Sequence, residues 1–153
     1  MIAADLMTEN PRTIRPTDTV SQALEALQSL EIRHLPVVDD ENNLVGMVSD
    51  RDLGPLMRSF TEGEEAERMI LTLSRRRVSD FMSADVICVD ADADLSEVID
   101  MMLDQHVGAL PVVDGEGVVQ GIISYVDVLR AVSGGIEAPE ERVTKSRGEQ
   151  RPT

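Results

Sequence analysis

Two short turns in this sequence pair a serine with an aspartate in a way that can bind a nucleotide. The segment Gly46–Asp52 reads GMVSDRD, and the segment Gly121–Asp127 repeats the pattern 75 residues later as GIISYVD. In each segment an apolar strand ends at a Ser, and an Asp follows where a helical pattern begins. The N-terminus of a helix offers unpaired N–H groups and partial positive charge to a phosphate. An ionised carboxylate can accept hydrogen bonds from both hydroxyls of a ribose.

The same pattern also has a purely structural interpretation. Ser-x-x-Asp is a capping box, in which the hydroxyl accepts from a free helix N–H and the acid reaches back to another. The residue types alone leave both interpretations open. The candidate ligand-binding residues, which are also candidate caps, are Ser49, Asp52, Ser124 and Asp127.

An internal repeat indicates which elements position the two turns. Residues 5–54 align with residues 80–129 without a gap and with 12 identities. The densest block is Leu-Pro-Val-Val-Asp, at 35–39 and again at 110–114. A gapless repeat of this length indicates one supersecondary unit that is used twice, with each copy burying its apolar face on the other.

Each copy predicts the order strand, helix, strand, strand, helix. Apolar spacing in copy one predicts strands over 12–15, 35–38 and 44–48, and helices over 20–30 and from 50 to about 58. Copy two repeats the pattern and ends with a helix from 125 to about 132. The prediction is an α+β (mixed α/β) fold of two β-α-β-β-α motifs packed with pseudo-twofold symmetry.

Two further features concern helix boundaries and the connection between the copies. Thr17 or Thr19 would cap the first helix of copy one, and Asp92 or Asp94 would cap its counterpart. Between the copies, residues 62–73 have helix-forming composition and apolar residues at helical spacing. We therefore expect a connecting helix.

The length of 153 residues fits two half-domains that share a core, because pieces of about 50 residues bury too little surface alone. We assign residues 1–58 to the first motif, 59–77 to the connection and 78–132 to the second motif. Residues 133–153 are charged and poor in apolar side chains, so we expect a disordered tail.

Charge and composition limit the classes of partner that the protein can bind. The formal net charge of −15 repels nucleic acid and anionic membrane surfaces. The single cysteine, Cys88, rules out an internal disulfide and suits a reducing compartment. No basic, apolar leader opens the sequence and no apolar run is long enough to span a bilayer. We expect a cytoplasmic protein with no nucleic-acid or membrane partner.

The sequence contains residues that resemble part of a calcium-binding loop and part of a catalytic site, but neither set is complete. Asp90–Asp94 begins like a calcium loop, but Leu95 stands where glycine is needed and Met101 where a bidentate glutamate belongs. Cys88 lies in an apolar strand, and the two histidines occupy different repeat positions, so no nucleophile has an evident base. We predict no metal site, no catalytic residue and no enzymatic activity.

The repeated Leu-Pro-Val-Val-Asp block and the Gly-x-x-Ser-x-x-Asp turn resemble tandem cystathionine-β-synthase-type (CBS) domains, a pair known as a Bateman module. The resemblance covers about residues 1–132. It implies a non-catalytic sensor of cellular energy or metabolites that binds AMP, ADP, ATP or S-adenosylmethionine in clefts between its repeats. Such pairs often associate as homodimers.

The resemblance also implies roles for individual positions. Asp52 and Asp127 match residues that hold ribose hydroxyls, and Ser49 and Ser124 match residues near the phosphate. The segments before and including the family's proline match Arg33, His34, Leu35, Pro36, Gly108, Ala109, Leu110 and Pro111. First-strand positions that line the adenine pocket match Thr13, Ile14, Cys88 and Val89.

The two copies differ in charge. Arg33, His34 and Arg51 of copy one align with Gly108, Ala109 and Val126 of copy two. On an acidic chain a polyphosphate needs such cations, so phosphate binding should depend on copy-one side chains. The His34 charge would also respond to pH near its reference pKa.

The leading hypothesis is a regulatory module that binds an adenine nucleotide, with no obligatory cofactor and with Mg²⁺ arriving only with the nucleotide, and that signals to a regulated protein. One alternative is a scaffold of the same fold that oligomerises without a ligand. Another is a subunit of an enzyme whose catalytic chain is encoded separately.

Overall fold

The computed structural model describes residues 1–30, 32–58 and 64–134. Most of the predicted tail, residues 135–153, lies outside the described residues, as does part of the connection, 59–63. The elements in chain order are α1 (Ala3–Leu6), β1 (Thr8–Glu9), α2 (Val20–Ser29), β2 (His34–Val38), β3 (Leu44–Ser49), α3 (Asp50–Arg58), α4 (Glu64–Arg75), a 3-10 turn η1 (Val78–Asp80), β4 (Val89–Asp90), α5 (Leu95–Gln105), β5 (Ala109–Val113), β6 (Val119–Ser124) and α6 (Tyr125–Gly134).

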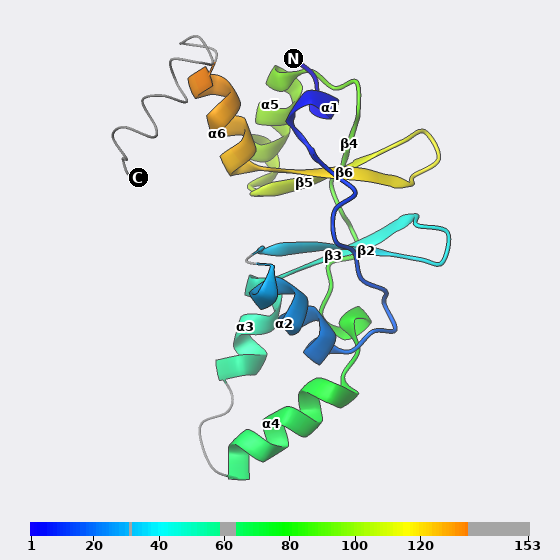
Figure 1. Cartoon of the computed structure of the whole chain (residues 1–153), viewed down its shortest axis with the longest axis vertical. Coiled ribbons are helices and arrows are strands. Elements are labelled where there is room, and N and C mark those ends of the chain that lie inside the picture. Colours follow the sequence, from blue (N-terminus) through cyan, green and yellow to red (C-terminus); the bar gives the residue numbers. More distant parts are fainter. Residues whose placement is uncertain (31, 59–63, 135–153) are drawn as a thin grey trace.

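Two similar units are stacked, with their hairpins facing each other (Figure 1). Unit one contains α2, β2, β3 and α3, and unit two contains β4, α5, β5, β6 and α6. The mixed α+β architecture is therefore confirmed. Strands β2 and β3 pair antiparallel, as do β5 and β6, and Leu35 opposite Val48 corresponds to Leu110 opposite Ile123.

The predicted first strand of copy one, residues 12–15, is wrong in extent. Only Ile14 pairs, as an isolated parallel bridge to Val37. Its N–H donates to the carbonyl of Pro36 (3.0 Å), and its carbonyl accepts from Val38 (2.8 Å). Pro11 and Pro16 flank the segment and supply no N–H, which limits ladder pairing. The counterpart β4 pairs with β5 over two residues.

The N-terminal segment of the chain packs on unit two rather than on unit one. Ala3 is fully buried in the core of unit two, and β1 pairs with β6. In the same way, the segment after α4 returns to unit one, where Val78 is fully buried. Ser83 there exchanges two backbone hydrogen bonds with Met47, of 2.8 and 3.0 Å. Each unit is thus completed by a segment that then crosses to the other unit (Figure 1).

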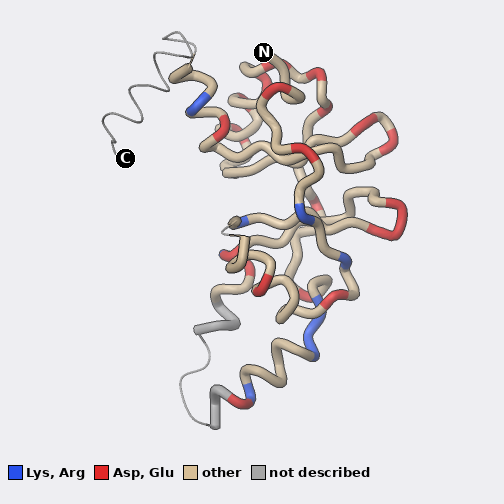
Figure 2. Tube along the Cα trace, in the orientation of Figure 1, with Lys and Arg blue, Asp and Glu red and all other residues tan. Residues whose placement is uncertain are grey.

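Both cores are built from aliphatic side chains, and among the described residues no polar or charged residue is buried. A smaller cluster joins the units near the hairpin turns, where Val38 packs with Val113 and Val119. The hairpins also bond to each other directly: Leu44 donates to Gly117 (2.9 Å), and Val119 donates to Asn42 (3.1 Å). Acidic residues gather at both hairpin tips (Figure 2).

Helix caps settle the alternatives left open by the sequence. Thr19 caps α2 in a capping box with Gln22, and Asp94 caps α5 in a box with Glu97. The expected connecting helix is α4, which packs against α2. Among the described residues, no helix is both long and apolar enough to cross a membrane.

Candidate functional site

Each Ser-x-x-Asp turn forms the capping box that its pattern predicts. Oδ2 of Asp52 accepts from the backbone N–H of Ser49 (2.8 Å) and from its hydroxyl (3.1 Å), and Ser49 Oγ accepts from the Asp52 N–H (3.3 Å). Ser124 and Asp127 form the same three bonds with the same lengths. A carboxylate has about four lone-pair sites, so a cap through Oδ2 leaves acceptors for another group.

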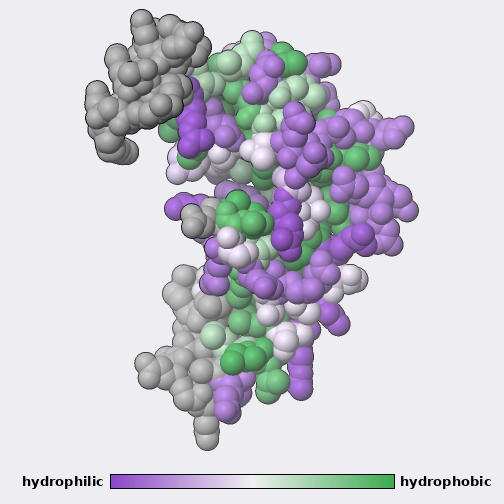
Figure 3. All heavy atoms as spheres, viewed as in Figure 1, coloured by the Kyte–Doolittle hydropathy of each residue, from purple (hydrophilic) through white to green (hydrophobic). Residues whose placement is uncertain are grey.

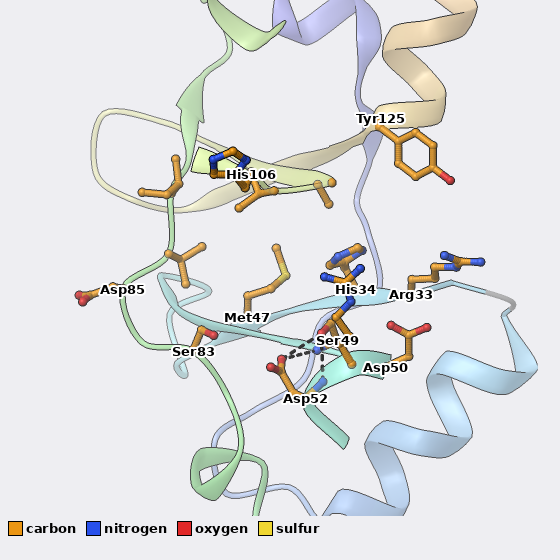
Figure 4. Close-up of a pocket in the computed structure, with 16 residues that line it drawn as sticks. Arg33, His34, Met47, Ser49, Asp50, Asp52, Ser83, Asp85, His106 and Tyr125 are labelled. Carbon is orange, nitrogen blue, oxygen red and sulfur yellow. Dashed lines mark hydrogen bonds between the residues drawn. The ribbon is translucent and has the colours of Figure 1, made fainter. Parts of the chain in front are cut away.

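The turn of unit one borders a cavity of about 400 Å³ between the units, which we call cleft A (Figure 4). It draws on both units and on the crossing segment after η1. Its lining residues are Arg33, His34, Met47, Ser49, Asp50, Arg51, Asp52, Ser83, Asp85, Val86, Ile87, His106, Val107, Gly108, Ala109 and Tyr125.

The turn of unit two borders a second cavity of about 600 Å³, cleft B. Its construction mirrors that of cleft A, with the segment after β1 in place of the segment after η1. Its lining residues are Thr8, Asn10, Pro11, Arg12, Leu30, Ile32, Arg33, His34, Gly108, Ala109, Ile122, Ser124, Tyr125, Val126 and Asp127. Both volumes lie in the range of small-molecule sites. A hollow between the two units opens at the left edge of the molecule in Figure 3.

Nine of the residues predicted from the sequence line these cavities. Four of them border both clefts, because they lie where β2 and β5 begin between the units: Arg33, His34, Gly108 and Ala109. Ser49, Arg51 and Asp52 line cleft A only. Ser124 and Asp127 line cleft B only. The structure thus brings each carboxylate to a different cavity.

The other eight predicted residues line neither cavity. They are Thr13, Ile14, Leu35, Pro36, Cys88, Val89, Leu110 and Pro111. Most of them lie in the hydrophobic cores; Leu35 and Leu110, for example, are fully buried. Cys88 packs against the cluster that joins the units.

The crossing segments contribute lining residues that the sequence reasoning missed. Residues 83 and 85–87 line cleft A, and residues 8 and 10–12 line cleft B. The gapless alignment pairs these two sets position by position, a signal that could have identified them. Asn10 turns the chain at the start of its crossing with φ 49°, a left-handed conformation that Asn tolerates better than most residues.

His106 is a further lining residue that had no predicted role. It ends α5 with φ 57°, and its N–H donates to the carbonyl of Met102. In Figure 4 its ring lies on the side of cleft A opposite His34 and Met47. Apolar spacing predicts roughly where a helix ends. It does not indicate that a histidine will end the helix in a left-handed conformation.

His34 is a lining residue whose pKa is changed by its surroundings. Burial lowers the pKa of His34 below its usual value, although the nearby carboxylates of Asp50 and Asp52 act in the opposite direction. His34 therefore favours its neutral form. Within the described parts of the chain, no three His, Cys, Asp or Glu side chains are grouped so that they could hold a metal ion.

Comparison with known proteins places this architecture in a family. The family model for the CBS domain matches residues 3–53 and 78–134. A curated relative, inosine-5'-monophosphate dehydrogenase of Methanocaldococcus jannaschii, is 30% identical over 128 residues, which cover 84% of this chain. This chain spans only 23% of that enzyme and 48% of an uncharacterized protein from the same archaeon.

Solved structures agree with the family match. CBSX2, a protein of Arabidopsis thaliana, is similar in its complex with AMP, with a TM-score of 0.75, 31% identity, and coverage of 89% of this chain and 98% of that chain. The cytosolic domain of the Mg²⁺ channel MgtE in complex with ATP has a TM-score of 0.66 and 32% identity, over 85% of this chain and 48% of that chain. The chain therefore belongs to the CBS domain family and carries two CBS domains in tandem.

Proposed function

We propose that this protein is a non-catalytic regulatory module that binds adenosine-containing ligands in clefts A and B. One observation carries the proposal: each of the two Ser-x-x-Asp turns borders its own cavity between the units. A purely structural cap has no need of a cavity beside it. Similar structures with AMP and with ATP support an adenosine-containing ligand.

The ribose is the part of the ligand that the turns suit best. Asp52 and Asp127 are half-buried, and each keeps acceptor capacity beyond its cap. The two neighbouring hydroxyls of a ribose are donors that match a carboxylate. Hydrogen bonds to a charged acceptor each contribute about 1.5–3 kcal/mol. Helices α3 and α6 begin at these turns, and a helix N-terminus by itself favours a negatively charged group nearby, so the other charges of each cleft decide whether a phosphate is bound.

The position of the clefts supports a regulatory role. Both clefts are bounded by the two units together with a crossing segment, so a bound ligand would contact both units and could favour one arrangement of them. Binding shifts such an arrangement only if the ligand has different affinity for the two states. We propose that the bound state is passed to a separate regulated protein, and that Mg²⁺ accompanies ATP rather than occupying a site of the protein.

The absence of catalysis is also part of the proposal. Burial raises the pKa of the Cys88 thiol, and Asp90 acts in the same direction, so the nucleophilic thiolate is disfavoured. Cys88 also lies outside both clefts. A subunit that serves a separately encoded enzyme would share these features, and capture of partners from the native host would identify it.

The module is proposed to act as a homodimer in the cytoplasm. The outer face of α6 carries apolar side chains that a second copy could cover: Val126, Leu129 and Val132 are 36%, 61% and 44% exposed. Their spacing places them along one stripe of the helix.

Isothermal titration with AMP, ADP, ATP and S-adenosylmethionine tests the proposal. At least one of them should bind the wild-type protein, and Asp52→Asn or Asp127→Asn should weaken binding in the affected cleft at least about tenfold. Asn retains an oxygen for the cap, so these variants should fold. Asp94→Asn is the matched control, because Asp94 also caps a helix but lines neither cleft.

The scaffold alternative predicts a different result. A ligand-free scaffold would give no heat with any of the four ligands at millimolar concentration. Replacing Asp52 or Asp127 by Ala would then cost only about 1–2 kcal/mol of stability through a weaker cap. That pattern would replace the sensor with an oligomerising interaction domain.

A further inference from the structure

Resting on the proposed function, we infer that the two clefts select ligands of different charge: cleft B binds phosphorylated adenosine compounds, and cleft A binds adenosine compounds without net negative charge. The inference comes from the charged side chains that the fold delivers to each cavity. The charges that distinguish the two clefts lie at positions where the two repeats of this chain have different residues.

Cleft A is the more acidic cavity. Its described lining residues include two arginines and three aspartates, Asp50, Asp52 and Asp85. Figure 4 shows Asp50 and Asp52 at the start of α3, and Asp85 on the crossing segment at the edge of the cavity, with its carboxylate directed outward. A phosphate group in this cavity would lie near the carboxylates of α3, Asp85 adds negative charge at the edge, and like charges repel.

Cleft B has the opposite balance. Of its described lining residues, Arg12 and Arg33 are basic and only Asp127 is acidic. If Asp127 is engaged with the ribose, both guanidinium groups remain for the phosphates, and guanidinium is the side chain best suited to them. The wall also carries apolar and aromatic groups, Ile32, Tyr125 and Val126, against which an adenine ring can pack.

The repeat explains how the asymmetry arises. Asp50 of cleft A corresponds to Tyr125, and Asp85 corresponds to Asn10, so cleft B lacks both additional acids. Arg12 of cleft B corresponds to Ile87, so cleft A lacks that base. Cleft A has Arg51 where cleft B has Val126, which offsets only part of the difference.

The residues shared by both clefts do not alter this comparison. Arg33 and His34 line both cavities, so they are not among the residues that distinguish the two linings. His106 lines cleft A alone. The comparison is made at about pH 8, above the lowered pKa of His34, so that the His34 charge does not contribute to either cleft.

The test is isothermal titration at about pH 8 with ATP and with adenosine, on the wild-type protein and on the two single variants Asp52→Asn and Asp127→Asn. ATP binding should be weakened at least about tenfold by Asp127→Asn and should remain within about threefold of wild type in Asp52→Asn. Adenosine binding in cleft A should be weakened at least about tenfold by Asp52→Asn and should remain within about threefold of wild type in Asp127→Asn.

Variants of the lining arginines test the charge assignment of the two clefts independently. Arg12→Ala should weaken ATP about tenfold while changing adenosine little, and Arg51→Ala should leave ATP nearly unchanged. ATP affinity should also fall with increasing salt more steeply than adenosine affinity. ATP binding that requires Asp52 and tolerates Asp127→Asn would overturn the charge assignment but keep the proposed function. If neither compound binds the wild-type protein, both fall.

Discussion

The contact between the N-terminal segment and β6 depends on the absence of a side chain at Gly121. A Cβ at this position would lie 2.5 Å from Sδ of Met7 and 2.8 Å from the carbonyl oxygen of Thr8. The Met7 side chain can change rotamer. The Thr8 carbonyl is less free, because Thr8 lies in β1 and is paired with Ile122 of β6. This carbonyl can move only if β1 shifts relative to β6. Gly121→Ala must therefore push β1 away from β6.

Overpacking of this kind usually costs about 1–3 kcal/mol. We expect Gly121→Ala to lower the free energy of unfolding by that amount in urea denaturation followed by circular dichroism. Gly115→Ala is the matched control, because a Cβ there meets nothing within 4 Å. The control should stay within about 0.5 kcal/mol of wild type.

The same substitution should act on ligand binding in one cleft only. β1 continues into residues 10–12, which line cleft B, so displacement of β1 should weaken binding there. Gly46→Ala is the symmetric variant: its Cβ would lie 2.7 Å from Met82 Sδ and 3.0 Å from the Ser83 carbonyl, at the segment that lines cleft A. A Gly121→Ala protein as stable as Gly115→Ala would refute the reasoning. So would loss of binding in the same cleft for both variants.

Three further predictions concern pH and association. Because the folded state lowers the pKa of His34, the unfolded state binds its proton first as pH falls below about 6.5, and stability is lost; His34→Gln should reduce the drop in urea midpoint between pH 7.5 and 5.5. Asp94 has a lowered pKa because it accepts the Glu97 N–H, so its stabilisation is present above its usual pKa and lost as pH falls through the lowered value; Asp94→Asn should lessen the loss of thermal stability from pH 5 to 3. Leu129 is 61% exposed, so Leu129→Glu should leave the far-UV circular dichroism spectrum of the folded protein unchanged while light scattering shows a change from two chains to one.

Local patterns predicted the helices and hairpins because their causes are local. The Thr19 box with Gln22 fixes the start of α2 through hydrogen bonds three residues apart, and such spacing can be read directly. The strand over 12–15 failed for a different reason. Its apolar and polar residues fit a strand, but pairing depends on which carbonyls of β2 lie within reach, and only Ile14 finds partners there.

The placement of the crossing segments could not be predicted from local patterns. Met7 and Met82 are identical in the alignment, which shows that they are equivalent but not which unit each one packs on. That choice is tertiary: Met7 packs against the core of unit two and Met82 against the core of unit one. The sequence indicated the two carboxylates as a pair, and the structure places each of them beside a cavity, but the crossing segments that line those cavities were not predicted.

The central claim is that a carboxylate in each cleft holds the two hydroxyls of a ribose. The most direct measurement compares AMP with 2′,3′-dideoxy-AMP by isothermal titration on the wild-type protein, because the two ligands differ only in those hydroxyls. We predict that AMP binds at least about tenfold more tightly, since the dideoxy compound leaves the carboxylate without its donors. Equal affinity for the two compounds would contradict the account.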